Sequence, residues 1–249
     1  MPPNTPVVAG STPLRLGFTA LTIALYLLFV AAVYVSARRS GTEPRRVQRW
    51  TLVAAALAGL WIAATGIAAA RGVLRMWSPP TMGPVLVGMM AIAIGVAISP
   101  LGGRIVAHIG IATLVGYQGF RIFVELLLHR AYVEGLMPEQ MSYAGRNFDI
   151  VSGVTALVLG AWLATGHRSR SLVLGWNALG VLLLANIVGV ALLSAPTPFR
   201  VFMNEPANTF ITRVPFVWLP AVMVLAAVMG HALVFRWLLP PPPAGESPV

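Results

Sequence analysis

Residues 110–149 read GIATLVGYQGFRIFVELLLHRAYVEGLMPEQMSYAGRNFD. The first half of this stretch is an apolar run interrupted at regular intervals by four polar side chains, Gln118, Arg121, Glu125 and His129. The second half is a polar loop that ends with Arg146, Asn147 and Asp149. Most of the remaining chain is apolar, so this stretch predicts both the kind of fold and the place of a site.

The composition of the whole chain is that of a helical membrane protein. Its 249 residues are 57% hydrophobic and only 10% charged, whereas soluble domains carry about 25% charged residues. Apolar runs of about 20 residues recur, and this is the length that a helix needs to cross a bilayer core of about 30 Å. The sequence therefore predicts an all-α fold, a polytopic transmembrane helical bundle.

Seven apolar runs predict seven transmembrane helices. They cover about residues 14–35, 51–70, 82–98, 104–128, 150–165, 172–193 and 214–239. The predicted organisation is a disordered N-terminal tail at 1–13, a seven-helix transmembrane domain at 14–239 and a disordered proline-rich tail at 240–249. The last assignment follows because a run of prolines cannot continue a helix.

The loop between the first two runs predicts the orientation. It contains five arginines, Arg38, Arg39, Arg45, Arg46 and Arg49. Basic residues are enriched in cytoplasmic loops, so we expect this loop inside, with the N-terminus outside and the C-terminus inside. The expected location is the plasma membrane, specifically a bacterial inner membrane. The same loop is expected to contact anionic lipids.

Residue types that are missing from the sequence exclude several functions. All 17 basic residues are arginine, so a lysine Schiff base is excluded. The absence of cysteine excludes disulfides, thiolate nucleophiles and cysteine metal ligands. The net charge of +10 would favour nucleic acid in a soluble protein. In a membrane protein it is better explained by loops at the lipid surface, so no nucleic-acid partner is expected.

The four polar residues of the predicted fourth helix share one face. They fall within about 80° of arc and about 16 Å of helix length. Arg121 and Glu125 are four residues apart, which is close enough for them to pair. A charge at the bilayer centre costs about 2.5–3.5 kcal/mol, so this face should point into the bundle. It is either an internal ion pair that locks the bundle or the wall of an outward-open polar cavity.

The cavity interpretation predicts that the protein binds or transports a small polar or amphipathic ligand. Other polar residues on the predicted outer side complete the site, and Arg121 is interpreted as the contact for an anionic group. The predicted ligand-binding set is Gln118, Arg121, Glu125, His129, Arg146, Asn147, Asp149, Asn186 and Glu205. Each of the added residues also has a structural explanation, such as a helix cap for Asp149 or an interhelical hydrogen bond for Asn186.

A membrane-embedded hydrolase or transferase is the first alternative, so the sequence leaves open whether the protein is an enzyme. Its candidate catalytic residues are Glu125, His129 and Asp149. Glu125 and His129, at i and i+4, could also ligate one metal ion, with a third oxygen from Asp149, Glu139 or Glu205. The HExxH pattern of zinc hydrolases is absent.

Three further alternatives remain. His108 and His231 lie at loosely matching predicted depths, which would suit a haem with two histidine ligands. Pro84 and Pro220 near the outer ends of the third and seventh runs are typical of broken helices in transporters. The protein could also be a structural or assembly subunit without a ligand. No cofactor is predicted, with zinc and haem b as the alternatives, and the sequence gives no oligomeric state.

Overall fold

The computed structural model describes residues 9–239, and within that range the chain is helical without a strand. The longest helices are α1 (Thr12–Arg39), α2 (Pro44–Ala70), α3 (Gly83–Ile98) and α8 (Arg170–Leu193). The shorter α-helices are α4 (Pro100–His108), α5 (Ile111–Gly116), α6 (Phe120–Val133), α7 (Ile150–Ala164) and α9 (Leu225–Leu238). Three 3-10 turns are η1 (Tyr117–Gly119), η2 (Glu139–Met141) and η3 (Phe210–Thr212), and η4 (Leu219–Val224) is a π-helical turn.

The predicted tails fall mainly outside the described residues, which exclude 1–8 and 240–249. The boundary of the first tail changes, because α1 already begins at Thr12. Ser11 precedes it as the N-cap, and its hydroxyl accepts a hydrogen bond from the backbone N–H of Leu14 at 3.4 Å.

Five segments of the described chain are long and apolar enough to cross a membrane: Thr12–Arg39, Pro44–Ala70, Ile111–Val133, Arg170–Leu193 and Leu219–Leu238. A sixth is added if α3 and α4, which meet at a bend of 61°, form one span. Helix α7 has 15 residues, or about 22 Å, which is shorter than the bilayer core. The described chain thus has five or six helical segments long and apolar enough to cross a membrane and a shorter α7, and the seven predicted spans are not all of that length.

The fourth predicted run, 104–128, is not one helix. The backbone is extended at Ile109 and Gly110, so α4 ends at His108 and the next helix begins at Ile111. The turn signal at 99–103 starts α4: the Ser99 hydroxyl accepts a hydrogen bond from the N–H of Gly102, and proline fits the first helical turn that follows. His108 therefore lies on a different helix from Gln118.

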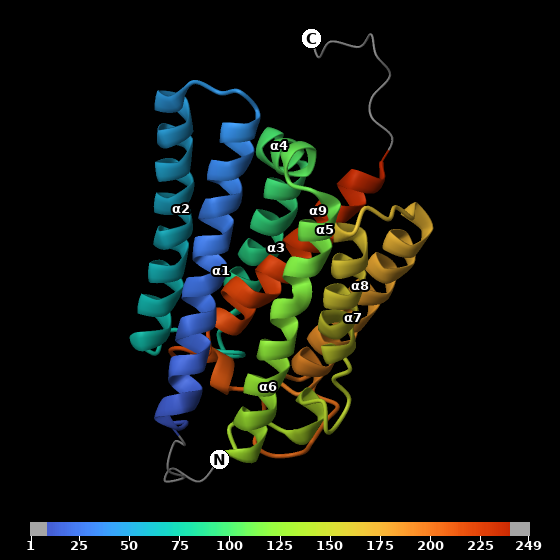
Figure 1. Ribbon diagram of the computed structural model, residues 1–249. Helices are drawn as coiled ribbons and strands as arrows, with labels where there is room; N and C mark the ends of the chain where they lie inside the picture. The colour runs from blue at the N-terminus through green and yellow to red at the C-terminus, as the bar shows by residue number, and fades with distance from the viewer. Residues whose placement is uncertain (1–8, 240–249) are drawn as a thin grey trace.

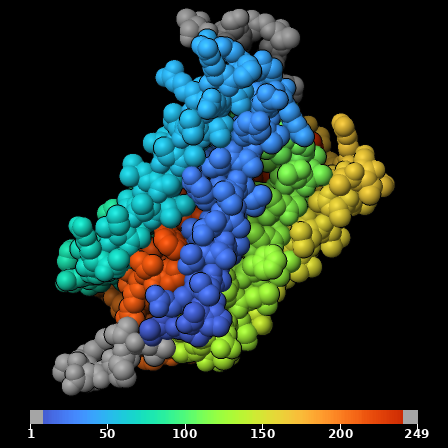
Figure 2. Space-filling model, turned by 60° about the vertical axis from the view of Figure 1, so that its left-hand side comes forward, coloured from blue at the N-terminus to red at the C-terminus, as the bar shows by residue number. Residues whose placement is uncertain are grey.

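The helices form one bundle with two ends (Figure 1). The α1–α2 connection, α4 and the α7–α8 connection lie at one end, which we call the arginine-rich end. The two long connections, 134–149 and 194–218, lie at the opposite end, the loop end. Helix α9 runs through the middle and packs against α3, α4, α5 and α8. In Figure 2, α1 lies between α2 and α6, and the start of the last helix is visible between α1 and α2.

Two tryptophan side chains form hydrogen bonds between α2 and the region of the π-helical turn η4. The Trp61 indole donates to the backbone oxygen of Ala221 at 2.8 Å, and the Trp218 indole donates to the backbone oxygen of Ile62 at 3.1 Å. Pro220 lies in this turn and brings no N–H to it. The predicted irregularity around Pro220 is thus a widened turn held by α2, whereas Pro84 only starts α3.

Close approach of α5 and α7 depends on small residues, as expected for helices packed in a membrane. A Cβ atom on Gly160 would lie 2.7 Å from the Cα of Gly116, which is a backbone atom and cannot move aside easily. A Cβ atom on Gly119 would collide with Cδ2 of Leu157, which is the end of a side chain. These glycines bring α7 against the helix that carries Arg121.

At the loop end, Glu134 joins the start of α1 to the end of α6. Its carboxylate accepts hydrogen bonds from the backbone N–H of Ser11 at 2.6 Å, from the Ser11 hydroxyl at 2.5 Å and from Arg130 Nε at 2.6 Å. Burial raises the pKa of Glu134. The hydrogen bonds from Ser11 and the bond and charge of Arg130 together lower this pKa by more than burial raises it, so it lies below the ordinary value of 4.5.

We predict that Glu134→Gln destabilises the protein at neutral pH but not in acid. A carboxyl group whose pKa is lowered by folding contributes stability above its unfolded pKa, and this contribution is lost as the pH falls through the folded pKa. Thermal unfolding of the two proteins in detergent should therefore show a gap at pH 7 that narrows below pH 4.5.

The control is Glu43→Gln, which removes an exposed partner of Arg46 at 3.9 Å and should change the melting temperature little at either pH. A gap between wild type and Glu134→Gln that stays constant or widens in acid would show that the carboxylate does not contribute in this way.

Candidate functional site

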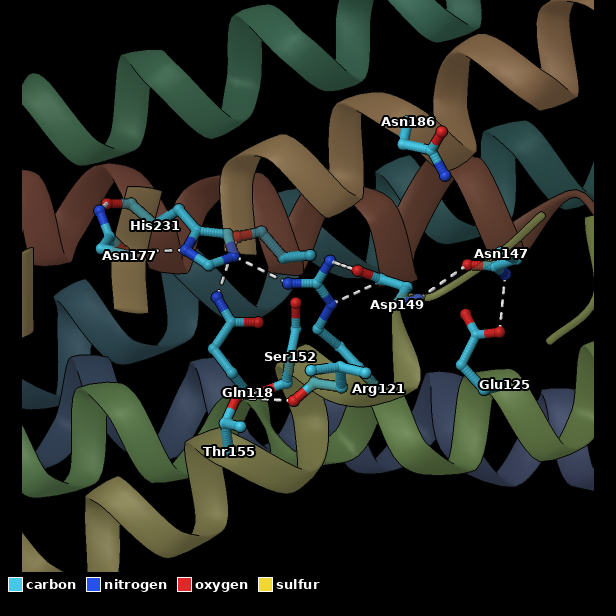
Figure 3. Close-up of polar contacts among 12 residues, drawn as sticks. Gln118, Arg121, Glu125, Asn147, Asp149, Ser152, Thr155, Asn177, Asn186 and His231 are labelled. Carbon is cyan, nitrogen blue, oxygen red and sulfur yellow. Dashed lines mark hydrogen bonds and ion pairs between the residues drawn. The ribbon is translucent and has the colours of Figure 1, made fainter. Parts of the chain in front are cut away.

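Arg121 is the centre of a buried polar cluster, and its side chain is only 2% exposed. It lies near the middle of the 23-residue segment Ile111–Val133. Its Nε donates to Asp149 Oδ2 at 2.7 Å, and its Nη2 donates to Asp149 Oδ1. Its Nη1 lies 2.8 Å from His231 Nε2 (Figure 3). Two parallel bonds to one carboxylate are the strongest way to pair an arginine.

The bond to Arg121 fixes the protonation of His231. A guanidinium only donates, so His231 Nε2 accepts and carries no proton. Its Nδ1 then carries the proton and donates to Asn177 Oδ1 at 2.8 Å, while Asn177 Nδ2 donates to the backbone oxygen of His231 at 3.2 Å. Every nitrogen of this histidine ring is therefore bonded, and the ring is neutral.

Asn147 connects the ion pair to Glu125 on the side of the loop end. The backbone N–H of Asp149 donates to Asn147 Oδ1 at 3.1 Å. Asn147 Nδ2 in turn donates to Glu125 Oε2 at 2.6 Å and to the backbone oxygen of Met141 at 3.1 Å. The buried polar cluster thus consists of six side chains in a row: Asn177, His231, Arg121, Asp149, Asn147 and Glu125.

The 134–149 loop places two of these residues by folding back into the bundle. Its backbone is supported by its own bonds, including Arg146 N–H to the oxygen of Gln140 at 3.1 Å, which membrane depth requires of irregular backbone. Helix α7 begins directly after Asp149, so the positive end of its dipole favours that carboxylate. The Asp149 side chain makes no capping bond to α7, and both of its oxygens bond Arg121.

Two glycines make room for the cluster. A Cβ on Gly180 of α8 would collide with the His231 ring, and a Cβ on Gly230 of α9 would collide with Tyr117 and Gln118. These two side chains instead donate to α9, Tyr117 Oη to the oxygen of Ala226 and Gln118 Nε2 to the oxygen of Ala227 at 3.0 Å.

The predicted pairing of Arg121 with Glu125 is wrong. Although the two residues are four apart on one helix, Arg121 bonds Asp149, and Glu125 bonds Asn147. The loop supplies a carboxylate that can meet the guanidinium with two bonds, and a helical neighbour does not do so here. The predicted role of Arg121 as a contact for an anionic ligand is also disfavoured, because Asp149 already compensates the charge of Arg121.

The other predicted site residues lie in different surroundings. Gln118, Asn147 and Asp149 are buried. His129 is half-buried and stacks on Tyr143 with ring centroids 4.3 Å apart. The remaining three are exposed at the loop end: Asn186 donates to the backbone oxygen of Arg146 at 2.8 Å, Arg146 lies over the Phe202 ring, and Glu205 bonds Arg200.

The geometry does not assemble the predicted metal or haem ligands. Among the described residues, no three His, Asp or Glu side chains are grouped so that they could hold a metal ion. The predicted set, Glu125 and His129 with Asp149, Glu139 or Glu205, is therefore not brought together. For haem, both ring nitrogens of His231 are bonded to protein groups, and His108 ends α4. No chemistry is assigned through either group.

A cavity of about 320 Å³ lies beside the polar cluster. Its walls come from α3, α6, α8 and the η4–α9 segment. They are apolar except for Arg121, Glu125, Asp149 and Asn208. Val87 on α3 and Leu192 on α8 line the cavity and are 70% and 46% exposed, so it opens to the surface between these two helices. The sequence predicted a polar cavity, but the cavity in the structure is lined mostly by apolar side chains, with polar side chains on one part of its wall.

Sequence reasoning missed two residues of this region, Tyr117 and Asn177. Asn177 is the one with a usable signal, since it is a lone amide within an apolar run, as Asn186 is. Only Asn177 is buried, and a sequence does not tell which of two such amides faces a neighbouring helix.

A family model described as "Domain of unknown function (DUF8737)" matches residues 79–239, which are 161 of the 249 residues. The chain belongs to this family. Comparison with curated proteins and with solved structures gives no match. The DUF8737 region runs from α3 to α9 and contains the whole buried polar cluster, whereas α1 and α2 precede it.

We predict that Asp149→Leu costs about 3–5 kcal/mol of stability, because it leaves the Arg121 charge buried without a partner. The double variant Arg121→Met with Asp149→Leu should be more stable than Asp149→Leu alone, since the buried charge is then gone. Denaturation of each protein in detergent measures both values.

Glu205→Ala is the matched control, because it breaks an ion pair of which the glutamate is 64% exposed; it should cost about 1 kcal/mol or less. If the double variant is less stable than Asp149→Leu, the unpaired charge of Arg121 is not the cause of the instability of Asp149→Leu.

Proposed function

We propose that this DUF8737 protein is a seven-span protein of the bacterial inner membrane, with its N-terminus outside and its C-terminus in the cytoplasm. The arginine-rich end supports the orientation, because arginines of the α1–α2 connection and its flanks, of α4, of the α7–α8 connection and of the end of α9 gather there: Arg38, Arg39, Arg45, Arg46, Arg49, Arg104, Arg168, Arg170 and Arg236. Arg104 lies 4.0 Å from the Trp50 ring centroid, a pairing suited to a membrane interface.

The short helix α7 is compatible with a seventh span. It begins directly after Asp149, which lies at the depth of Arg121 within the bundle. The 134–149 loop fills the remaining depth at the loop end, where Leu136, Met137 and Met141 are buried. Such irregular backbone is tolerated in a membrane where it is enclosed by protein.

Within this protein, the cavity is the binding site for a lipid-like amphiphile with a single chain. The observation that carries this proposal is the combination of apolar walls, an opening between α3 and α8, and a buried carboxylate on the wall, that of Glu125. In a membrane, the opening would face the acyl chains, so a ligand could enter sideways from the bilayer.

The size and lining of the cavity fit one hydrocarbon chain with a small head. Its volume is at the lower end of the range of about 300–1,000 Å³ for ligand sites. The methionines Met89, Met90 and Met223 contribute adaptable apolar surface to its wall. The tail would occupy this surface and the head would meet the polar wall.

Binding is favoured over the hydrolase or transferase alternative by the position of the three candidate catalytic residues. Glu125 lines the cavity, but Asp149 is occupied by Arg121, and His129 does not line the cavity. One carboxylate facing an apolar space is enough to recognise a head group.

We predict that Val188→Trp reduces amphiphile binding at least tenfold, because it fills the cavity from α8. The measurement uses two 16-carbon probes with the same photoreactive diazirine in the tail, one an alcohol and the other a carboxylate. Protein in nanodiscs is photolabelled, and the labelled peptides are identified by mass spectrometry. Label from at least one probe should map to α3, α8 and the η4–α9 segment in the wild type.

The control is Leu182→Trp on the same helix, where the side chain is 68% exposed and does not line the cavity; it should leave this labelling unchanged. Labelling by both probes that is spread evenly over exposed helix surfaces, and is equal in Val188→Trp, would refute the proposed site.

A further inference from the structure

Two side-chain oxygen atoms of residues that line the cavity are left over after the fold has formed its own bonds. They belong to Glu125 on α6 and to Asn208 in the 194–218 connection, and both residues line the cavity while being only 1% exposed. Whether these atoms accept or donate hydrogen bonds determines which head group can bind.

Hydrogen bonding fixes the orientation of Asn147, and through it the free oxygen of Glu125. The oxygen of Asn147 is identified because it accepts from the backbone N–H of Asp149, so its amide nitrogen faces Glu125. This nitrogen occupies Glu125 Oε2. Within the described residues, Oε1 accepts no hydrogen bond and is the oxygen left for a ligand.

Asn208 is oriented in the same manner. Its Nδ2 donates to the backbone oxygen of Ala191 at 2.9 Å, and its backbone N–H donates to the oxygen of Ser194 at 2.9 Å. Both acceptors are carbonyls at the end of α8, where the helix offers no donors of its own. The remaining Asn208 Oδ1 is buried without a hydrogen-bond partner in the described residues, an arrangement that is costly unless a ligand donates to it.

Among the described residues, Arg121 is the only cation that lines the cavity, and it offers little to an anion. Its charge is compensated by two bonds to Asp149, and a third N–H bonds His231. A carboxylate or phosphate head would therefore meet two acceptors, Glu125 and Asn208, without an uncompensated positive charge.

We propose that the head group of the amphiphile is an uncharged hydroxyl, whose one O–H donates to Glu125 or to Asn208, and that the same site discriminates against carboxylate heads. This rests on the proposed function, since it concerns the ligand of the same cavity. The chemical class is a single-chain alcohol, whether a free fatty alcohol or a chain esterified to a polyol.

The test compares the two photoreactive probes by competition with unlabelled 16-carbon compounds. Hexadecanol should displace the alcohol probe from wild-type protein at a concentration about tenfold lower than palmitate does. The monoglyceride of palmitate, which carries two hydroxyls, should also compete better than palmitate. Its rank against hexadecanol distinguishes a polyol ester from a free alcohol.

Glu125→Gln provides a sharper test, because Asn147 still presents its nitrogen. The new amide must turn its oxygen toward Asn147 and its NH2 group toward the cavity, which replaces an acceptor with a donor. The preference for hexadecanol over palmitate should then fall at least tenfold. Glu139→Gln, a change at an exposed loop residue outside the cavity, should leave the preference as in the wild type.

The outcomes separate the two proposals. If no 16-carbon compound displaces either probe from the cavity, the proposed function fails. If cavity labelling depends on Val188 but palmitate competes as well as hexadecanol in the wild type, the binding site stands and the hydroxyl inference is overturned. This comparison needs no variant, so it holds even if Glu125→Gln does not fold. An unchanged preference in folded Glu125→Gln would also overturn the inference.

Discussion

The buried positive charge of Arg121 is the constraint on which the rest of the site depends. A guanidinium in the middle of a membrane helix is expensive unless it is paired and fully hydrogen-bonded. The fold meets this requirement with a carboxylate from a loop and a neutral histidine from the last helix, Asp149 and His231. Three parts of the chain that are far apart in sequence are thereby brought to one point.

Several features of the fold follow from this pairing. The 134–149 connection has to enter the bundle for its carboxylate to reach α6, so α7 begins at depth and is short. His231 needs the space left by Gly180 and the support of Asn177. Asn147 then extends the polar row to Glu125, which is the one carboxylate of the row that has an oxygen left for the cavity. The cluster therefore both stabilises the bundle and supplies a recognition group.

The sequence predicted the class of fold well, since apolar runs of membrane length are a strong local signal. It missed the break at Ile109 and Gly110, where α4 ends and α5 begins, because both residues are apolar or small and the apolar run continues through them. Arg121, Glu125 and Asp149 were all predicted, but their partners were not, because pairing depends on how a loop returns to a helix. His231 was considered as a haem ligand because its predicted depth loosely matched that of His108, and its true partners, Arg121 and Asn177, were not predicted. The apolar lining of the cavity was not predicted, since it requires knowing that α3 and α8 both pack against α9.

A density map of the protein in a lipid nanodisc, obtained by cryo-electron microscopy with a bound antibody fragment, tests the central claim most directly. The claim is that a paired Arg121 leaves Glu125 and Asn208 to receive the head of an amphiphile. The predicted result is elongated density that enters between α3 and α8 and ends within hydrogen-bond distance of both residues. A cavity closed by rotated side chains, with Glu125 paired to Arg121 in place of Asp149, would contradict it.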